Sequence, residues 1–162
     1  MKKICVYLFL AFALCGCRAE ETFETISDDI VAPVMAVPRQ VTVQLPEDAV
    51  APVLESDTRQ IYMSTGYEIA IETLSAGDLN ATVQALSGYE TGNLTILETQ
   101  QGDITRYEFV WASAGEEGDR LGRAVILDDG EYHYCMSVLR DAAGEEDSQI
   151  VWSDVFGSFS LQ

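Results

Sequence analysis

His133 is the only histidine of the chain, and it lies two residues from Cys135. Residues two apart on a β-strand point to the same face, so a cysteine nucleophile with a histidine base is conceivable here. The surrounding residues 131–140 read as a strand inside a sheet, where a substrate has poor access. We therefore expect a packed core histidine beside a buried thiol. A small hydrolase is the enzymatic alternative, although no Gly-x-Ser-x-Gly segment is present.

Carboxylates gather in three turn-like segments: Glu116-Glu117-Gly118-Asp119, Asp128-Asp129-Gly130-Glu131 and Glu145-Glu146-Asp147. Calcium takes several oxygen ligands, which such loops could supply, so a calcium-responsive module is a second alternative. None of the three fits the twelve-residue loop of an EF-hand, and no Cys or His cluster has zinc spacing. Carboxylates beside glycine are more often solvated turn residues. We expect no catalytic, cofactor-binding or metal-ligating residue.

Aromatic side chains recur at alternate positions of two strand-like segments. Tyr107, Phe109 and Trp111 share one strand face, and Tyr132 and Tyr134 share another. Exposed stripes of this kind could bind a glycan or a peptide, whereas buried ones form core. The alternation from residue 105 to residue 111 reads as one inward face, so we expect core.

The first 17 residues, MKKICVYLFLAFALCGC, have the order of an export signal. Two lysines precede an apolar run from Ile4 to Leu14, which is too short to span a bilayer as a helix. The end of the run resembles the bacterial lipobox, with Leu14 as the aliphatic residue and Gly16 as the small one. That resemblance implies cleavage after residue 16 and a thioether between Cys17 and diacylglycerol, a two-chain anchor. An ordinary secretory signal is the alternative.

The charge of the chain excludes several classes of partner. The 162 residues carry 27 acidic and 9 basic side chains, a formal net charge of −18. From Cys17 onward seven arginines oppose all 27 acids, giving −20. Nucleic-acid binding needs a basic footprint, so we expect no nucleic-acid partner. Direct electrostatic docking on anionic lipid is disfavoured for the same reason.

Three segments follow from these observations: a signal at 1–16, an acidic lipid-anchored tether at 17–38 and a folded domain at 39–162. The tether shows no persistent period of 2 or 3.6 and is typical of a flexible spacer. Alternatively, residues 30–37 form a short first strand or lie pinned on the domain. Once Cys5 and Cys15 leave with the signal and Cys17 carries lipid, Cys135 has no disulfide partner.

Within the domain, periodicity predicts both strands and helices. Alternation or β-rich composition predicts strands over residues 41–45, 59–63, 67–74, 94–99, 104–113, 121–128 and 131–140. Leu79, Val83 and Leu86 have helical spacing, and Gly88 follows as a helix C-terminal residue. Near the end of the chain, Trp152, Val155, Phe156 and Phe159 follow i, i+3, i+4, i+7, which predicts an amphipathic helix that Asp147 or Ser148 can cap.

The Asp129-Gly130 pair is the strongest hairpin signal of the chain. As a two-residue loop it would pair Leu127 with Tyr132 on one face and Ile126 with His133 on the other. Both faces of this hairpin are largely apolar, which indicates cover on both sides. The two predicted helices are the candidate covers. The expected fold is α+β, an antiparallel sheet between helical layers.

The order of the predicted strands and helices along the chain resembles that of the PsbP-like sandwich. The matching residues are Val43-Gln44-Leu45-Pro46 near the start and Trp152-Ser153-Asp154-Val155-Phe156-Gly157-Ser158-Phe159 at the end. Members of that family are mostly assembly or binding accessories, and no binding residue can be carried over. The chain is also similar in style to uncharacterised lipoproteins of gut Firmicutes, which implies no activity.

The resulting expectation is a lipoprotein on the extracytoplasmic face of the cell membrane. Membrane lipid is its partner through Cys17. Its domain would be a noncatalytic binding or accessory module at the cell envelope for a protein, a peptide or a small ligand.

Overall fold

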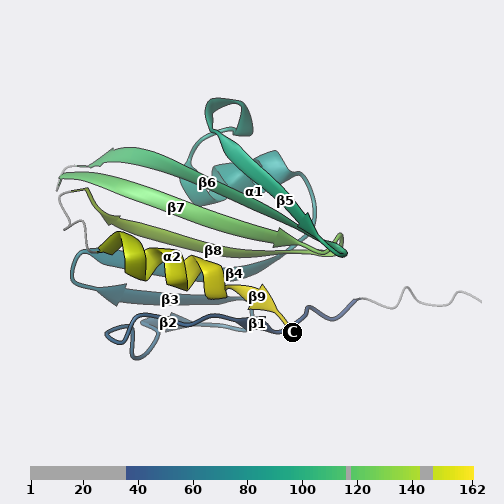
Figure 1. The fold of residues 1–162 in the computed structure, drawn as a ribbon, viewed down its shortest axis with the longest axis horizontal. Coiled ribbons are helices and arrows are strands. Elements are labelled where there is room, and N and C mark those ends of the chain that lie inside the picture. The colour runs from purple at the N-terminus through teal and green to yellow at the C-terminus, as the bar shows by residue number, and fades with distance from the viewer. Residues whose placement is uncertain (1–35, 116–117, 143–147) are drawn as a thin grey trace, which may run out of the picture. The chain divides into compact units, whose positions relative to one another are not determined.

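The fold is of the α+β class, built on one antiparallel sheet. The structure is a computed structural model that describes residues 36–115, 118–142 and 148–162, without the side chains of 115 and 148–151. The sheet has seven strands in the order β2-β3-β4-β8-β7-β6-β5 (Figure 1). Its strands are β2 (Leu54–Glu55), β3 (Arg59–Ser64), β4 (Tyr67–Ser75), β5 (Ile96–Gln101), β6 (Ile104–Gly115), β7 (Gly118–Asp128) and β8 (Tyr132–Asp141).

Several sequence predictions fall outside the described residues. They are the signal at 1–16, the lipid attachment at Cys17, the tether up to residue 35, two acids of the first acidic segment and the whole of Glu145-Glu146-Asp147. The proposed helix cap at Asp147 belongs to the same group.

One face of the sheet, called here the α2 face, packs against the second helix. Helix α2 (Ser148–Ser158) lies in front of β8 and β4 in Figure 1. Its predicted apolar positions are buried, and they cluster with residues from alternate positions of β4, β7 and β8. The cluster includes Trp152, Val155, Phe156, Phe159, Ile69, Ile71, Val125, Leu127, Tyr134, Met136 and Val138. The helix ends one residue before Phe159, which is nevertheless buried.

The opposite face, called the α1 face, packs against α1 (Leu79–Ser87). Asp78 caps this helix by accepting a hydrogen bond from the backbone N–H of Asn80 at 3.0 Å. Gly88 ends it with a φ of 80°, a conformation that glycine adopts without strain. The buried residues of this layer are Val83, Phe109, Trp111, Ala124, Ile126 and Cys135. Helices on both faces confirm the covered sheet that the two-sided apolar hairpin predicted.

The two ends of the described chain meet beside α2. Strand β1 (Val41–Thr42) pairs with β9 (Ser160–Leu161) in a separate two-stranded sheet. The predicted strand at 41–45 is therefore shorter than expected, and Val43 and Leu45 pack against the α2-face core without strand pairing. The sequence did not reveal β2 and β9, because two-residue strands carry no periodicity.

The β7–β8 hairpin has a different register from the predicted one. Leu127 pairs with Tyr134 and Asp128 with His133, a shift of two residues that moves the loop to Gly130-Glu131. The cause is Asp129, whose backbone N–H donates to the Tyr132 carbonyl at 3.3 Å. A shift of two preserves alternation, so the predicted division of residues between the two faces is correct.

A glycine allows the closest packing on the α1 face. The indole of Trp111 lies directly over Gly122, and a Cβ there would overlap its ring carbons. The ring also contacts Phe109 at 5.7 Å between centroids. Only a residue without a side chain lets the indole lie against β7.

Replacing Gly122 with alanine should therefore destabilise the fold. Overpacking of this kind costs about 1–3 kcal/mol, measured as the free energy of unfolding in urea. Gly77→Ala is the matched control, because a Cβ there meets nothing within 4 Å. Equal stabilities of the two variants would contradict this account of Trp111.

Candidate functional site

His133 and Cys135 lie inside the molecule, on the α1 face of β8. Their exposed fractions are 1% and 0%. The His133 Nδ1 is 2.8 Å from the Thr82 hydroxyl of α1, and its Nε2 is 3.7 Å from Asp128 Oδ2. Burial raises the pKa of the Cys135 thiol, which disfavours the nucleophilic thiolate. The structure thus keeps both side chains away from any external substrate, as expected for core residues.

The acidic hairpin uses its carboxylates to build its own turn. Asp129 accepts hydrogen bonds from the backbone N–H groups of Glu131 and Tyr132 at 3.0 and 2.8 Å, and from the Tyr134 hydroxyl at 2.9 Å. Asp128 accepts one from the N–H of Gly130 at 2.8 Å. Burial would raise the pKa of Asp129, but these hydrogen bonds lower it below its usual range. Among the described residues no group of three or more His, Cys, Asp or Glu side chains could hold a metal ion.

The aromatic stripe on β6 is mostly core. Phe109 and Trp111 are buried on the α1 face, as predicted, and Tyr107 is half-buried. Tyr134 of the second set is fully buried on the α2 face, with Tyr132 half-buried beside it. An exposed aromatic stripe for a glycan or a peptide is therefore not formed by these strands.

A groove opens where α2 leaves part of its face uncovered. A helix is about 10–12 Å across and strands lie about 4.8 Å apart, so one helix covers only two or three strands. In Figure 1, α2 lies over β8 and β4 and leaves β6 and β7 beside it. The groove has a volume of about 770 Å³. Its lining comprises Val110, Trp111, Ala112, Leu121, Gly122, Arg123, Val138, Arg140, Trp152, Ser153 and Phe156.

Strand register brings the groove residues together from three strands. Val110 pairs with Arg123, which in turn pairs with Val138. One step along, Ala112 pairs with Leu121, which pairs with Arg140. Since partners in an antiparallel pair share a face, these two rows form a continuous floor on the α2 face.

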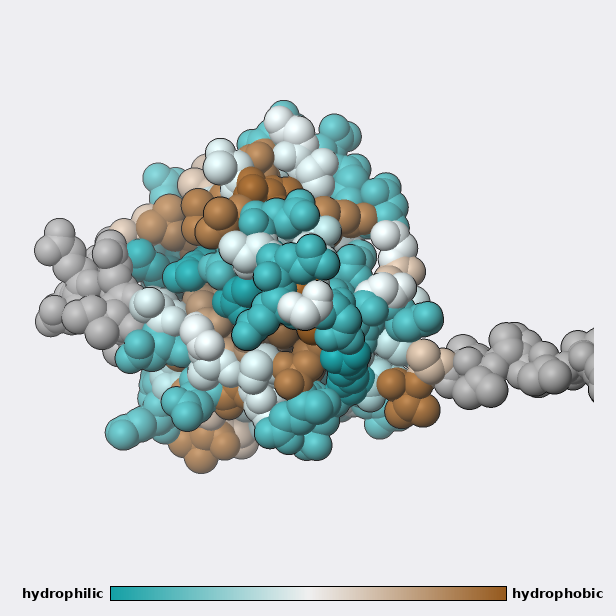
Figure 2. Space-filling model, turned by 45° about the vertical axis from the view of Figure 1, so that its right-hand side comes forward, coloured by the Kyte–Doolittle hydropathy of each residue, from teal (hydrophilic) through white to brown (hydrophobic). Residues whose placement is uncertain are grey.

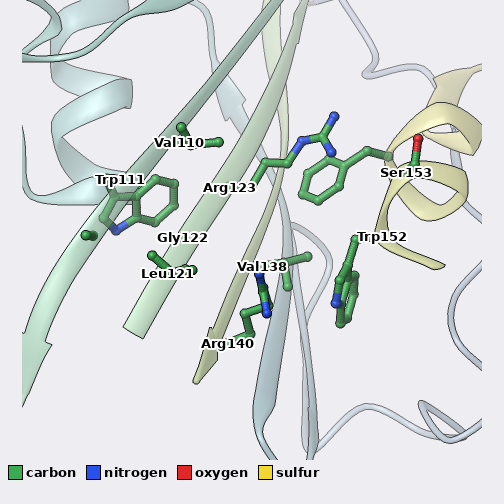
Figure 3. Close-up of a pocket in the computed structure, with 11 residues that line it drawn as sticks. Val110, Trp111, Leu121, Gly122, Arg123, Val138, Arg140, Trp152 and Ser153 are labelled. Atoms are coloured by element: carbon green, nitrogen blue, oxygen red, sulfur yellow. The ribbon is translucent and has the colours of Figure 1, made fainter. Parts of the chain in front are cut away.

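Helix α2 supplies the wall of the groove through Trp152, Ser153 and Phe156. Figure 3 labels the first two of these residues. The Trp152 ring meets Tyr67 edge-on, with centroids 4.9 Å apart. The guanidinium carbon of Arg123 lies 4.3 Å from the centre of the Phe156 ring, a cation–π contact. Both contacts help to fix the positions of the wall residues.

A charged network ties the floor to the end of the helix. Glu108 accepts hydrogen bonds from Arg123 Nη2 at 2.9 Å and from Arg106 Nε at 2.7 Å. Arg106 also donates to the carbonyls of Phe156 and Phe159, at 2.8 and 3.2 Å, where a helix C-terminus favours a cation. Burial would raise the pKa of Glu108, but the bonds from the two arginines outweigh it and lower that pKa.

Apolar surface continues beyond the groove across the same face. Leu97 of β5 and Val110 of β6 are 61% and 63% exposed, and Leu121 of β7 is 37% exposed. Figure 2 shows a brown band across the upper part of the molecule, at the height of these strands. Groove and band together make an amphipathic surface with two arginines among the residues that line it.

From the sequence alone, no groove residue was predicted to belong to a functional site. Trp111 was considered only as a member of the aromatic stripe on β6, and that stripe was expected to be core. A signal was available in Arg123, which interrupts an otherwise apolar run in a hairpin expected to be covered on both faces. The apolar residues of the groove carry no such signal, because the sequence does not distinguish an exposed valine from a buried one.

No protein-family model and no curated protein matches this sequence. Neither helix of the described part is long and apolar enough to cross a membrane. The groove is therefore interpreted from its own geometry and charge.

The Glu108 network predicts a pH-dependent contribution to stability. Because its pKa is lowered in the folded state, Glu108 stabilises the fold above the unfolded pKa of about 4.3, and this contribution is lost as the pH falls further. Glu108→Gln should cost about 1–3 kcal/mol at pH 7, with the difference from wild type shrinking between about pH 5 and pH 3. Urea unfolding at a series of pH values measures it.

Glu98→Gln is the control. Glu98 is an exposed glutamate on β5, the strand next to β6, which carries Glu108. It should change stability by less than about 0.5 kcal/mol. A Glu108→Gln deficit that stays constant from pH 7 to pH 3 would contradict the role given to the carboxylate.

Proposed function

We propose that the protein is a lipid-anchored extracytoplasmic lipoprotein whose domain is a noncatalytic binding module at the cell envelope. The observation that carries the binding role is the open, largely apolar groove of about 770 Å³ between α2 and the β6–β8 strands. Sites for small molecules are typically concave, mostly apolar and about 300–1,000 Å³ in volume, with a few polar groups that orient the ligand. The groove has this character, with Arg123, Arg140 and Ser153 as its polar groups.

The anchor rests on the order of residues in the first 17 positions. A basic start, an apolar run and the Leu14-Cys15-Gly16-Cys17 ending support cleavage after residue 16 and lipid on Cys17. Eighteen residues then separate Cys17 from Ala36, which span at most about 65 Å when extended. In this proposal the partner of the anchor is membrane lipid.

The first described residue lies at the end of the β7–β8 hairpin that is away from the groove. Ala36 lies beside the β7–β8 turn, because its carbonyl accepts a hydrogen bond from the Tyr132 hydroxyl at 2.6 Å. The groove lies toward the other end of β7 and β8, around Leu121 and Arg140.

A PsbP-like arrangement is part of the same proposal. Support comes from the helix on each face of an antiparallel sheet and from Leu45, just before Pro46, which packs on the α2 face. The resemblance favours an accessory or binding role. A hydrolase is the weaker choice, because both residues that could form a Cys–His pair are buried.

Replacing Cys17 with serine should abolish the anchor. A serine cannot form the thioether, so the variant should move from the membrane fraction to the soluble fraction, measured by fractionation and by metabolic labelling with a radioactive fatty acid. Cys15→Ser is the matched control and should remain labelled and membrane-bound. Unchanged membrane association of Cys17→Ser would overturn the anchor.

A neutral apolar probe tests the groove itself. N-phenyl-1-naphthylamine should bind the full chain carrying Cys17→Ser, and adding Leu121→Glu should weaken its affinity about tenfold, since a charge on the floor must be desolvated. Leu97→Glu is the control, because Leu97 is exposed on the same face and does not line the groove. Equal affinities of the two glutamate variants would count against binding in the groove.

A further inference from the structure

Helix α1 covers only part of the sheet face on which it packs. Its layer of buried side chains draws on β6, β7 and β8. In Figure 1 the helix lies at the level of β5 and β6, away from β2 and β3. A helix about 10–12 Å across covers two or three strands that lie about 4.8 Å apart. Among the described residues, no helix therefore covers the α1 face of β2, β3 and the first half of β4.

Apolar side chains line this uncovered part of the sheet. Strand register places Leu54 opposite Ile61, and Ile61 opposite Ala70. Met63 lies two residues from Ile61 and so points to the same face. Leu54 and Met63 are 47% and 58% exposed, and none of the four residues belongs to either core cluster. These four residues, called here the β3 patch, form an apolar surface that no described segment packs against.

The shape of the β3 patch suits a helix. Register places Ser137 of β8 next to Ala70, so two small side chains make a low floor beside the larger Ile61 and Met63. Strands β2, β3 and β4 together span about 10 Å, which is the width of one helix. A helix laid here would complete the second layer of the sheet in the way that α1 does over β6 and β7.

The charge beside the β3 patch favours a cationic partner. Glu68 is the cross-strand neighbour of Met63 in the β3–β4 hairpin, and it makes no ion pair with any described residue. Glu72, further along β4, is already paired with Arg59 at 3.7 Å. Over the whole chain, 9 basic side chains cannot neutralise 27 carboxylates. The resulting negative field attracts a basic segment and repels an acidic one.

We propose that the β3 patch is the docking surface for an amphipathic helix of a partner protein, with basic residues beside its apolar stripe. The stripe, with apolar residues at i, i+3, i+4 and i+7, packs on Leu54, Ile61 and Met63. A lysine or arginine next to the stripe interacts with Glu68. A second copy of this chain is disfavoured as the occupant, because two molecules of net charge −18 repel each other. The patch lies on the face opposite to the groove, so the proposal does not depend on the groove.

Two labelled peptides test the charge and the shape of the partner. Both are about 14 residues long, with leucine at the positions of the apolar stripe. One carries lysine at the remaining positions and the other carries glutamate. Fluorescence anisotropy with the full chain carrying Cys17→Ser measures their affinities. The lysine peptide should bind saturably and at least tenfold more tightly than the glutamate peptide, because the domain is acidic.

Matched variants separate docking on the β3 patch from general attraction to an acidic protein. Met63→Ser should weaken the lysine peptide about fivefold, because it removes apolar contact area. Leu97→Ser is its control, since Leu97 is similarly exposed, at 61%, but lies on the α2 face. Glu68→Gln should weaken the peptide about threefold, whereas Glu98→Gln removes the same charge on β5 and should leave the affinity unchanged. Thermal melting of each variant identifies any loss of folding.

Three results would overturn the proposal. The first is the absence of saturable binding by the lysine peptide, or equal affinities of the two peptides. The second is an equal loss in Met63→Ser and Leu97→Ser, which would show attraction without a site. The third is self-association of the chain in sedimentation velocity that Met63→Ser abolishes, which would assign the patch to a second copy. None of these results bears on the groove, which the neutral probe tests separately.

Discussion

The central strands of this protein are apolar on both faces, and this constraint shapes the rest of the fold. Along β7 the consecutive residues Ala124, Val125, Ile126 and Leu127 are all buried, and Tyr134, Cys135 and Met136 repeat the pattern on β8. A sheet with this composition needs cover on both sides. Helix α1 supplies it on one face, while α2 and the paired chain ends supply it on the other.

The same constraint explains why a groove exists. A single helix is too narrow to cover a seven-stranded sheet, so the α2 face is partly open at β6 and β7. Glu108 couples this open region to the helix, because it accepts hydrogen bonds from Arg106 and from Arg123. Arg106 also donates to the Phe156 carbonyl of α2, and Arg123 contacts the Phe156 ring. The candidate site is therefore built into the packing of the helix and is not an addition at the surface.

Local patterns predicted most of the elements and the burial of key side chains. The helical spacing of Leu79, Val83 and Leu86, the Gly88 end of α1 and the strand at residues 67–74 are local features, and the structure confirms each of them. The hairpin register was wrong by two residues because the Asp129 carboxylate organises the turn through three hydrogen bonds, which the Asp-Gly pair alone does not reveal. The β1–β9 pair joins residues more than a hundred positions apart, so no local pattern could indicate it.

The sequence by itself determined the α+β class, the need for cover on both faces and the core positions of His133 and Cys135. Those properties follow from the period and composition of single segments, which short-range sterics and the hydrophobic effect translate directly into structure. Only the tertiary structure decided that Val110 and Leu121 stay exposed while Val138 beside them is buried. Exposure at these positions depends on where a helix of limited width lies across the sheet, and that placement is set by long-range packing and by the Arg106–Glu108–Arg123 network.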